Sequence, residues 1–222
     1  MEPIKAKEGE IFDIELEEDL LKKNEELARQ NRRTLDEHKI LAIDIMGSIG
    51  TGKTSLIKSL IFHLKGKYEI GVIAGDLTTT IDADRIKEEG IKVIQVNTGK
   101  ECHLDANLIK KALKKFDLST LNLLFIENVG NLICPADFPL GSHCRIVVVS
   151  VTEGPWMVRK HPYIFSQANV AVINKIDLAE AMKVSPEKLA KDVYEINPAV
   201  KVIPANCITG KGTKEIIQAL SF

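Results

Sequence analysis

The chain has 222 residues, a length that suits one α/β domain or one domain with a short appendage. Its 30 basic and 31 acidic residues give a formal net charge of −1, so we do not expect nucleic acid as a partner. The sequence contains no secretory signal pattern and no apolar run of about 18 residues, which predicts a cytoplasmic protein without a membrane partner.

The N-terminal segment is predicted to be a tail followed by a helix. Residues 15–38 are rich in strong helix formers, whereas residues 1–12 lack periodicity. A thin stripe of leucines indicates a helix that packs along one side. The stripe consists of Leu16, Leu20, Leu27 and Leu35. We therefore divide the chain into a tail and packed helix at 1–38 and a domain at 39–222.

Seven short apolar runs follow, and most of them are continuous rather than alternating, which is typical of strands covered on both faces. The runs are Ile40–Met46, Ile70–Ala74, Lys92–Val96, Leu121–Ile126, Ile146–Val151, Val170–Ile173 and Val200–Ile203. Most are separated by helical patterns at Thr54–Leu64, Ala83–Glu89, Leu104–Phe116, Pro186–Ile196 and Thr213–Leu220. This alternation predicts an α/β fold with a mostly parallel seven-stranded sheet flanked by helices.

A glycine-rich segment between the first run and the first helical pattern has the form G-x-x-x-x-G-K-T, which predicts a P-loop NTPase. Glycines allow backbone N–H groups to face phosphates, and the helix N-terminus favours an anion. Lys53 is expected to reach the β- and γ-phosphates, and the Thr54 hydroxyl is expected to bind Mg²⁺. The predicted phosphate contacts are Gly47, Ser48, Gly50, Thr51, Gly52, Lys53, Thr54 and Ser55. A chance glycine-rich turn is the alternative, and the strand–loop–helix context disfavours it.

The sequence Asn-Lys-Ile-Asp ends the sixth run and predicts a guanine site. Asp177 can accept two hydrogen bonds from guanine, and adenine offers no such donor pair. Asn174 can brace the loop, and the stem of Lys175 can cover the ring. Asn206 and Cys207 follow the last run and resemble the small-residue loop that contacts the guanine oxygen in GTPases. The alternative is a solvated loop.

Acidic residues at two strand ends predict the magnesium site. Glu127 and Gly130 form E-x-x-G, where most GTPases carry D-x-x-G. Asp76 ends the second run, and Asp82 lies in the polar loop that follows, which we predict to be the first switch. Both are candidate outer ligands of Mg²⁺, although Asp82 could instead cap the next helix. The predicted catalytic residues are Lys53, Thr54, Asp76 and Glu127. No residue is marked as the water-positioning group, which predicts slow GTP hydrolysis.

Cysteine and histidine occur together after the third and fourth runs, at Cys102-His103 and at Cys134. Thiolate and imidazole are apt ligands for Zn²⁺ or Ni²⁺. Spacing alone favours a buried thiol and a histidine at a helix start, because adjacent Cys-His is not a usual chelate and three ligands leave a site incomplete. A two-fold dimer could complete the set. His143 and Cys144, just before a strand, have no evident role.

The segments 97–106 and 127–135 resemble the HypB family, GTPases that assist nickel insertion during [NiFe]-hydrogenase maturation. The resemblance covers about residues 38–220. It implies a homodimer controlled by GTP and GDP, slow hydrolysis, and an interfacial Zn²⁺ or Ni²⁺ site made of Cys102, His103 and Cys134. It also implies two partners, a hydrogenase large-subunit precursor and a nickel or zinc chaperone.

Two departures from that family's pattern stand out. Residues 1–38 hold no cysteine and only His38, so tight nickel storage there is not expected. Position 48 is serine, which excludes an intermonomer lysine from that position. Three alternatives stay open. They are a urease-type accessory GTPase like UreG, a signalling or scaffold GTPase with structural zinc, and a small-molecule kinase, which Asp177 disfavours.

Overall fold

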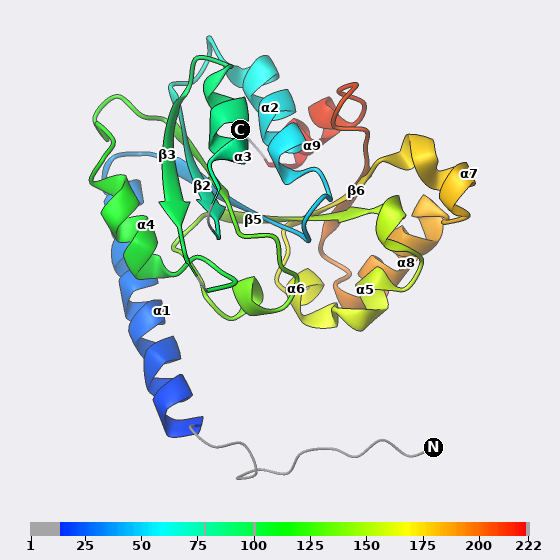
Figure 1. Ribbon diagram of the computed structural model, residues 1–222, viewed down its shortest axis with the longest axis horizontal. Helices are drawn as coiled ribbons and strands as arrows, with labels where there is room; N and C mark the ends of the chain where they lie inside the picture. Colours follow the sequence, from blue (N-terminus) through cyan, green and yellow to red (C-terminus); the bar gives the residue numbers. More distant parts are fainter. Residues whose placement is uncertain (1–13, 78, 100, 221–222) are drawn as a thin grey trace.

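The computed structural model describes residues 14–77, 79–99 and 101–220, with the side chains of 14–17 excepted. Seven parallel strands form one sheet in the order β3-β2-β4-β1-β5-β6-β7 (Figure 1). The strands are β1 Leu41–Met46, β2 Ile70–Asp76, β3 Lys92–Asn97, β4 Leu123–Glu127, β5 Cys144–Ser150, β6 Val170–Asn174 and β7 Lys201–Pro204. Each lies within about three residues of a predicted run, because continuous Val/Ile/Leu segments are buried on both faces of a parallel sheet. The predicted fold class is confirmed.

The α-helices are α1 Ile14–Glu37, α2 Lys53–Leu64, α3 Ile81–Lys87, α4 Ala106–Leu113, α5 Met157–Lys160, α6 Pro162–Ser166, α7 Ala179–Met182, α8 Pro186–Ile196 and α9 Thr213–Ala219. The α-helix α1 precedes the first strand, α9 follows the last strand, and the other α-helices lie between strands. The 3₁₀ turns are η1 Cys134–Ala136, η2 Val151–Glu153 and η3 Ile176–Leu178. The sequence did not predict α5, α6 or α7, since four or five residues are too few to establish a helical period.

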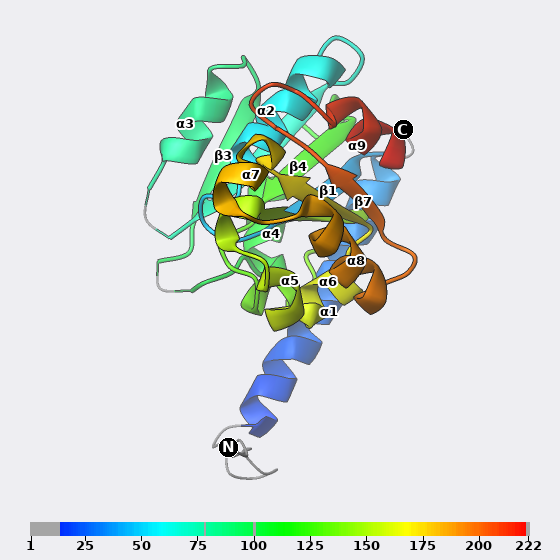
Figure 2. The same ribbon diagram turned by 90° about the vertical axis from the view of Figure 1, so that its right-hand side faces the viewer.

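Helices cover both faces of the sheet (Figures 1 and 2). One face packs against α2, α3 and α9, with Leu56, Ile86 and Ile216 among the buried contacts. The other face divides into a cluster under α5, α6 and α8 and a second cluster under α1 and α4. None of the helices in the described part of the chain has the length and apolar character needed to cross a membrane.

The packing of α1 differs from the predicted leucine stripe. Leu20 is 56% exposed, and Leu16 lies outside the side chains that the structure describes. Leu35 is buried as expected, but the other buried positions include two asparagines, Asn24 and Asn31. Amide side chains therefore help to attach this helix to the domain. The N-terminal end of α1 extends well beyond the body of the domain (Figure 1).

The two asparagines hold α1 to two other segments. Asn24 accepts from Ala106 N at 2.8 Å and donates to Pro139 O at 2.9 Å. Asn31 donates to Ala106 O at 2.8 Å and to Leu140 O at 3.1 Å. The start of α4 and the loop after η1 are thus tied to α1, and these segments adjoin the Cys/His residues described below.

Candidate nucleotide and metal sites

The phosphate loop joins β1 to α2 at the carboxyl edge of the sheet, where ligands bind in open α/β folds. A Cβ on Gly47 would collide with Val148 O, and one on Gly52 would collide with the Asn174 amide. Both glycines also have positive φ, at 151° and 103°. Only glycine fits these two positions, so the backbone can curl around a phosphate as the motif predicts.

Lys53 crosses this loop. Its Nζ donates to Gly47 O at 3.0 Å and to Ser48 O at 3.1 Å, and the residue is only 7% exposed. Burial lowers the pKa of Lys53, while nearby carboxylates, first that of Glu127, act in the opposite direction. The lysine therefore lies between the phosphate-binding loop and a group of carboxylates. A lysine that contacts the β- and γ-phosphates needs this position.

Three hard oxygen donors meet beside Lys53. The Thr54 hydroxyl lies 2.7 Å from Glu127 Oε1 and 2.8 Å from Asp82 Oδ1, although it has one proton to donate. Glu127 is 3% exposed, and burial raises its pKa to about 7. Among the residues that the structure describes, Glu127 Oε2 has no hydrogen-bond partner. A buried carboxylate with an unpaired oxygen next to a hydroxyl and a second carboxylate fits Mg²⁺.

The two aspartates of the predicted switch differ in position. Asp82 lies within the first turn of α3, whose N-cap is Thr80, so the capping alternative for Asp82 is wrong. Asp76 stands at the end of β2 and accepts from Thr79 N at 2.7 Å and from Thr79 Oγ1 at 3.0 Å. Asp82 therefore contacts Thr54 directly, whereas Asp76 shapes the turn that leads toward α3.

The base motif is fastened to the phosphate loop. Asn174 donates to Thr51 O at 2.7 Å and accepts from Cys207 N at 3.0 Å, so one side chain spans three segments. Lys175, at φ 60°, extends over the loop to donate to Gly50 O at 2.6 Å. Asp177 accepts from Asn206 Nδ2 at 2.8 Å. These bonds set the carboxylate of Asp177 at the edge where the motif predicts guanine.

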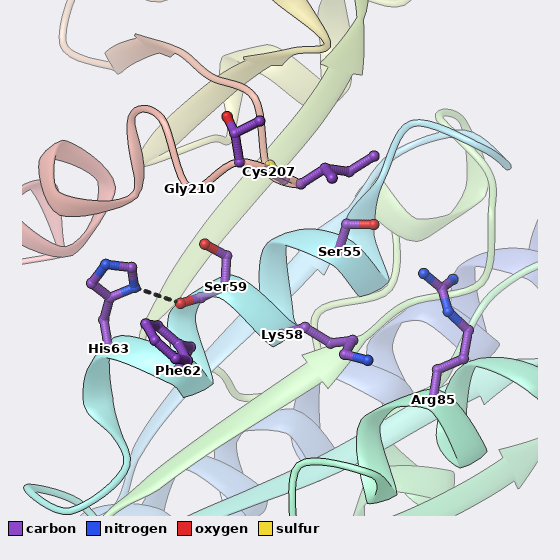
Figure 3. A pocket seen from close by; sticks show the side chains of 10 residues that line it. Ser55, Lys58, Ser59, Phe62, His63, Arg85, Cys207 and Gly210 are labelled. Atoms are coloured by element: carbon purple, nitrogen blue, oxygen red, sulfur yellow. Dashed lines mark hydrogen bonds between the residues drawn. The ribbon is translucent and has the colours of Figure 1, made fainter.

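Cys207 is a buried packing residue, 4% exposed, and burial raises the pKa of its thiol to about 12. It borders a cavity of about 550 Å³ that begins near Ser55 and follows α2 toward Phe62 and His63 (Figure 3). The side chain of Arg85, from α3, points into the same space. The cavity lies between α2 and the loop after β7, and its lining does not include Asn174, Lys175 or Asp177 of the base motif.

The residues Cys102, His103 and Cys134 come together where the loop after β4 meets the segment after β3. Cys102 Sγ lies 3.0 Å from Cys134 Sγ and 3.9 Å from His103 Nδ1. In the described part of the chain, they are the one group of three or more His, Cys, Asp or Glu residues whose ligand atoms gather within 4.8 Å. The ring of His103 stacks on Phe138 at 3.8 Å between centroids.

The group has the ligand types of a borderline metal site, and its thiols would lose their protons when a metal binds. The neighbouring Cys134 thiol raises the pKa of Cys102, and burial lowers the pKa of His103, which favours neutral imidazole. Two sulfurs and one nitrogen are ligands that Zn²⁺ and Ni²⁺ accept. By contrast, His143 bonds Asp36 at 2.8 Å and Ala42 N at 3.0 Å near the start of β5, and it takes no part in this group.

Comparisons with known proteins agree with this geometry. A family model described as the CobW/HypB/UreG nucleotide-binding domain matches residues 41–204. The probable hydrogenase maturation factor HypB of Methanocaldococcus jannaschii is 49% identical over 205 residues, which cover 92% of this chain and 93% of that protein. This chain belongs to the HypB family.

Solved structures of HypB family members have the same fold. HypB from Archaeoglobus fulgidus, at 49% identity, has a TM-score of 0.83 over 89% of this chain and 97% of that one. HypB from Helicobacter pylori, solved in complex with nickel, is 30% identical with a TM-score of 0.84 over 89% and 93%. The resemblance predicted from segments 97–106 and 127–135 is confirmed.

Sequence reasoning missed several residues around this HypB-type site. Asn128 and Asn131, on the loop after β4, bond to the segment that carries Cys102. Phe138 stacks on the ring of His103. Glu153 accepts a hydrogen bond from Ser150 N at 2.8 Å, and its carboxylate opposes the lowering of the pKa of Lys53 by burial. The only available signal was position, because Asn128 lies inside the E-x-x-G motif and Asn131 directly follows it.

Proposed function

We propose that this protein binds and slowly hydrolyses GTP with Mg²⁺ and acts as a metallochaperone for nickel insertion into [NiFe]-hydrogenase. Lys53 and the phosphate-loop amides bind the phosphates, and Asp177 selects guanine. Thr54, Asp82 and Glu127 hold Mg²⁺, with Asp76 as a further outer ligand. The ion neutralises charge on the β- and γ-phosphates. Gly130 brings its N–H toward the γ-phosphate from a loop that packs on Ile49 of the P-loop.

The cargo in this proposal is Ni²⁺ or Zn²⁺, bound by Cys102, His103 and Cys134. Metal binding displaces the thiol protons, so affinity should rise with pH. A closed structural zinc site has four protein ligands, whereas this group offers three and is only partly buried. The partial exposure of all three ligands favours an exchangeable cargo over structural zinc. The Helicobacter pylori relative, solved in complex with nickel, supports the choice of metal.

A homodimer completes the proposal. Large apolar side chains are exposed at or near the carboxyl edge of the sheet, and a second copy could cover them. They include Ile49 at 80%, Ile81 at 64%, Ile133 at 63% and Trp156 at 51% exposure. Ile133 adjoins Cys134, so a two-fold contact through this edge would bring two three-ligand groups near each other. Hydrolysis would then weaken the dimer or the metal site and release metal to a hydrogenase large-subunit precursor or a partner chaperone.

One observation carries this proposal. Cys134 lies seven positions after Glu127, and the two ends of this segment contact Thr54 and Cys102 respectively. A change at the γ-phosphate therefore lies one short segment away from the metal ligands.

The test measures Ni²⁺ affinity and molecular mass with GDP and with a non-hydrolysable GTP analogue, each with Mg²⁺. The proposal expects both quantities to differ between the two states. Equal affinities and equal masses would overturn nucleotide control. ATP that competes as well as GTP would favour the kinase alternative, and a Cys102→Ala variant that still supports hydrogenase maturation would favour structural zinc.

A further inference from the structure

Asn128 joins the nucleotide side of the loop after β4 to the cysteine segment. Its side chain is 1% exposed. Nδ2 donates to Asp44 Oδ1 at 3.2 Å, and Oδ1 accepts from Leu104 N at 3.2 Å. The residue before it is Glu127, which contacts Thr54, and Leu104 directly follows Cys102-His103. One buried amide therefore spans from the end of β4 to the backbone that carries two of the three metal ligands.

Asn131 makes a second link three residues further on. It pairs with Gly47 of the phosphate loop in an isolated antiparallel bridge. Its Nδ2 donates to Cys102 O at 3.4 Å, and its Oδ1 accepts from Ile133 N at 2.9 Å. Thus Asn131 touches the phosphate loop with its backbone, and with its side chain it touches the cysteine segment and the residue before Cys134.

We propose that Asn128 and Asn131 are positioning residues that couple the nucleotide state to the geometry of the metal ligands. The inference rests on the function proposed above. A displacement of the loop after β4 must move both amides, because each is bonded on two sides. The amides in turn move the backbone at Cys102 and next to Cys134, which changes the Sγ–Sγ separation.

The residue type suits this role. Each link needs a donor and an acceptor on one short side chain, and a carboxylate or an aliphatic group cannot supply both. At Asn128 the donor meets a carboxylate, which makes that bond charge-assisted when Asp44 is ionised. Leu104 adds a packed contact, because a Cβ on Gly75 of β2 would lie 2.7 Å from Leu104 Cδ1. The segment is therefore held between the ends of β2 and β4.

The experiment measures the ratio of Ni²⁺ dissociation constants with GDP and with the GTP analogue, by isothermal titration at saturating Mg²⁺. Allosteric couplings typically correspond to about 5-fold or more, so we expect at least that ratio in the wild-type protein. Asn131→Ala should bring the ratio to within about 2-fold of unity, while nucleotide affinity and unfolding temperature stay close to wild type. Asn128→Ala should act in the same direction, and if it does not fold, Asn131→Ala decides.

Asn122→Ala is the matched control. Asn122 lies just before β4, at the opposite end of the strand, and its Oδ1 accepts from Glu69 N at 3.0 Å. This control removes the same kind of bond without touching either site, so it should keep the wild-type ratio. A wild-type ratio that persists in Asn131→Ala would overturn the inference and leave the proposed function intact. Equal affinities in the wild-type protein would instead overturn nucleotide control itself.

Discussion

The carboxyl edge of the sheet is built differently on its two sides. On the β6 side the strand is wholly buried, and Asn174 and Lys175 bind the phosphate loop through direct side-chain bonds. On the β2–β3 side, β3 is only half buried, and α3 has seven residues, of which Ala83 and Ile86 are buried. Asp82 thus reaches Thr54 from a short helix with few buried contacts.

This difference suits the two sides to two different roles, constant binding of the base and response to the γ-phosphate. The β6 side is fixed by bonds within the protein, so under the proposed function it would bind GDP and GTP through the same contacts. The magnesium side has a half-buried strand and a short helix with two buried residues, and segments with few buried apolar contacts open locally at low free-energy cost. A nucleotide-controlled protein needs the first side to stay constant and the second side to respond.

The largest expected effect lies on the fixed side. Asp177→Asn loses two charge-assisted hydrogen bonds to guanine, each worth about 1.5–3 kcal/mol, so GTP affinity should fall by about 10²–10⁴-fold. GDP affinity should fall by the same factor, because the base is identical. The variant should gain affinity for xanthosine triphosphate, since the new amide can donate to the carbonyl that replaces the guanine amine.

Equilibrium titration with fluorescent analogues of the three nucleotides measures these changes. Unaltered GTP affinity in Asp177→Asn would show that the carboxylate does not contact the base. If the affinity for GTP falls and the affinity for GDP does not, the distinction between the two sides is wrong, because the β6 side would then respond to the γ-phosphate.

Glu127→Gln probes the responsive side with a residue of equal size and no charge. Removing one carboxylate from the Mg²⁺ set should slow GTP hydrolysis by about 10²-fold, since metal stabilisation of the phosphates is worth several kcal/mol. GDP affinity should stay within about 3-fold of wild type. Phosphate release under single turnover gives the rate, and Glu88→Gln, which removes a surface partner of Lys58, is the control. A rate within 3-fold of wild type for Glu127→Gln would remove this residue from the magnesium site.

Asp44 lies on β1, between the two sides, and should make stability depend on pH. Burial raises its pKa to about 6, opposed by Arg145 at 4.0 Å and by Asn128. The folded state therefore holds the proton more tightly than the unfolded state. The resulting stabilisation is complete below pH about 4 and is lost as the pH rises through about 6.

Asp44→Asn removes that titration. Between pH about 4 and about 7, the free energy of unfolding of the variant should gain about 2 kcal/mol relative to wild type. Urea unfolding at several pH values, with the difference between the two proteins plotted, isolates this group because all others titrate in both. A flat difference would mean that Asp44 titrates alike in the folded and unfolded states.

The sequence predicted the fold because apolar strands and the G-x-x-x-x-G-K-T loop are local patterns. The contact between Thr54 and Asp82 was harder to predict from the sequence. It depends on where α3 packs, and residue 82 could equally have capped that helix from its position alone. The three-ligand group was disfavoured by spacing and became expected only through resemblance, since residues 102 and 134 are brought together by the loop after β4.

The asparagines were the main omission. Neutral amides carry neither charge nor hydropathy that would mark them, and on a helix they interrupt the apolar stripe. The leucine pattern therefore predicts the packed face of α1 incompletely, because Leu20 is exposed and Asn24 and Asn31 are buried. Buried amides are identified only by their partners, and these are backbone groups of residues more than 70 positions away for Asn31.

Asn31→Ala therefore tests whether α1 supports the responsive side, with the smallest of the expected effects. The substitution leaves Ala106 O and Leu140 O without this donor, and the free energy of unfolding should fall by about 2 kcal/mol, or about 4–8 °C in unfolding temperature. Gln30→Ala is the matched control, because the side chain of Gln30 accepts from Lys110 at the exposed surface, and the substitution should change stability by less than about 0.5 kcal/mol. Because Asn31 holds the start of α4 and the loop after η1, the loss should also weaken Ni²⁺ binding while guanine nucleotide affinity is retained. Loss of both affinities together would mean that the two sides of the sheet unfold as one unit, and the division between a fixed and a responsive side would fail.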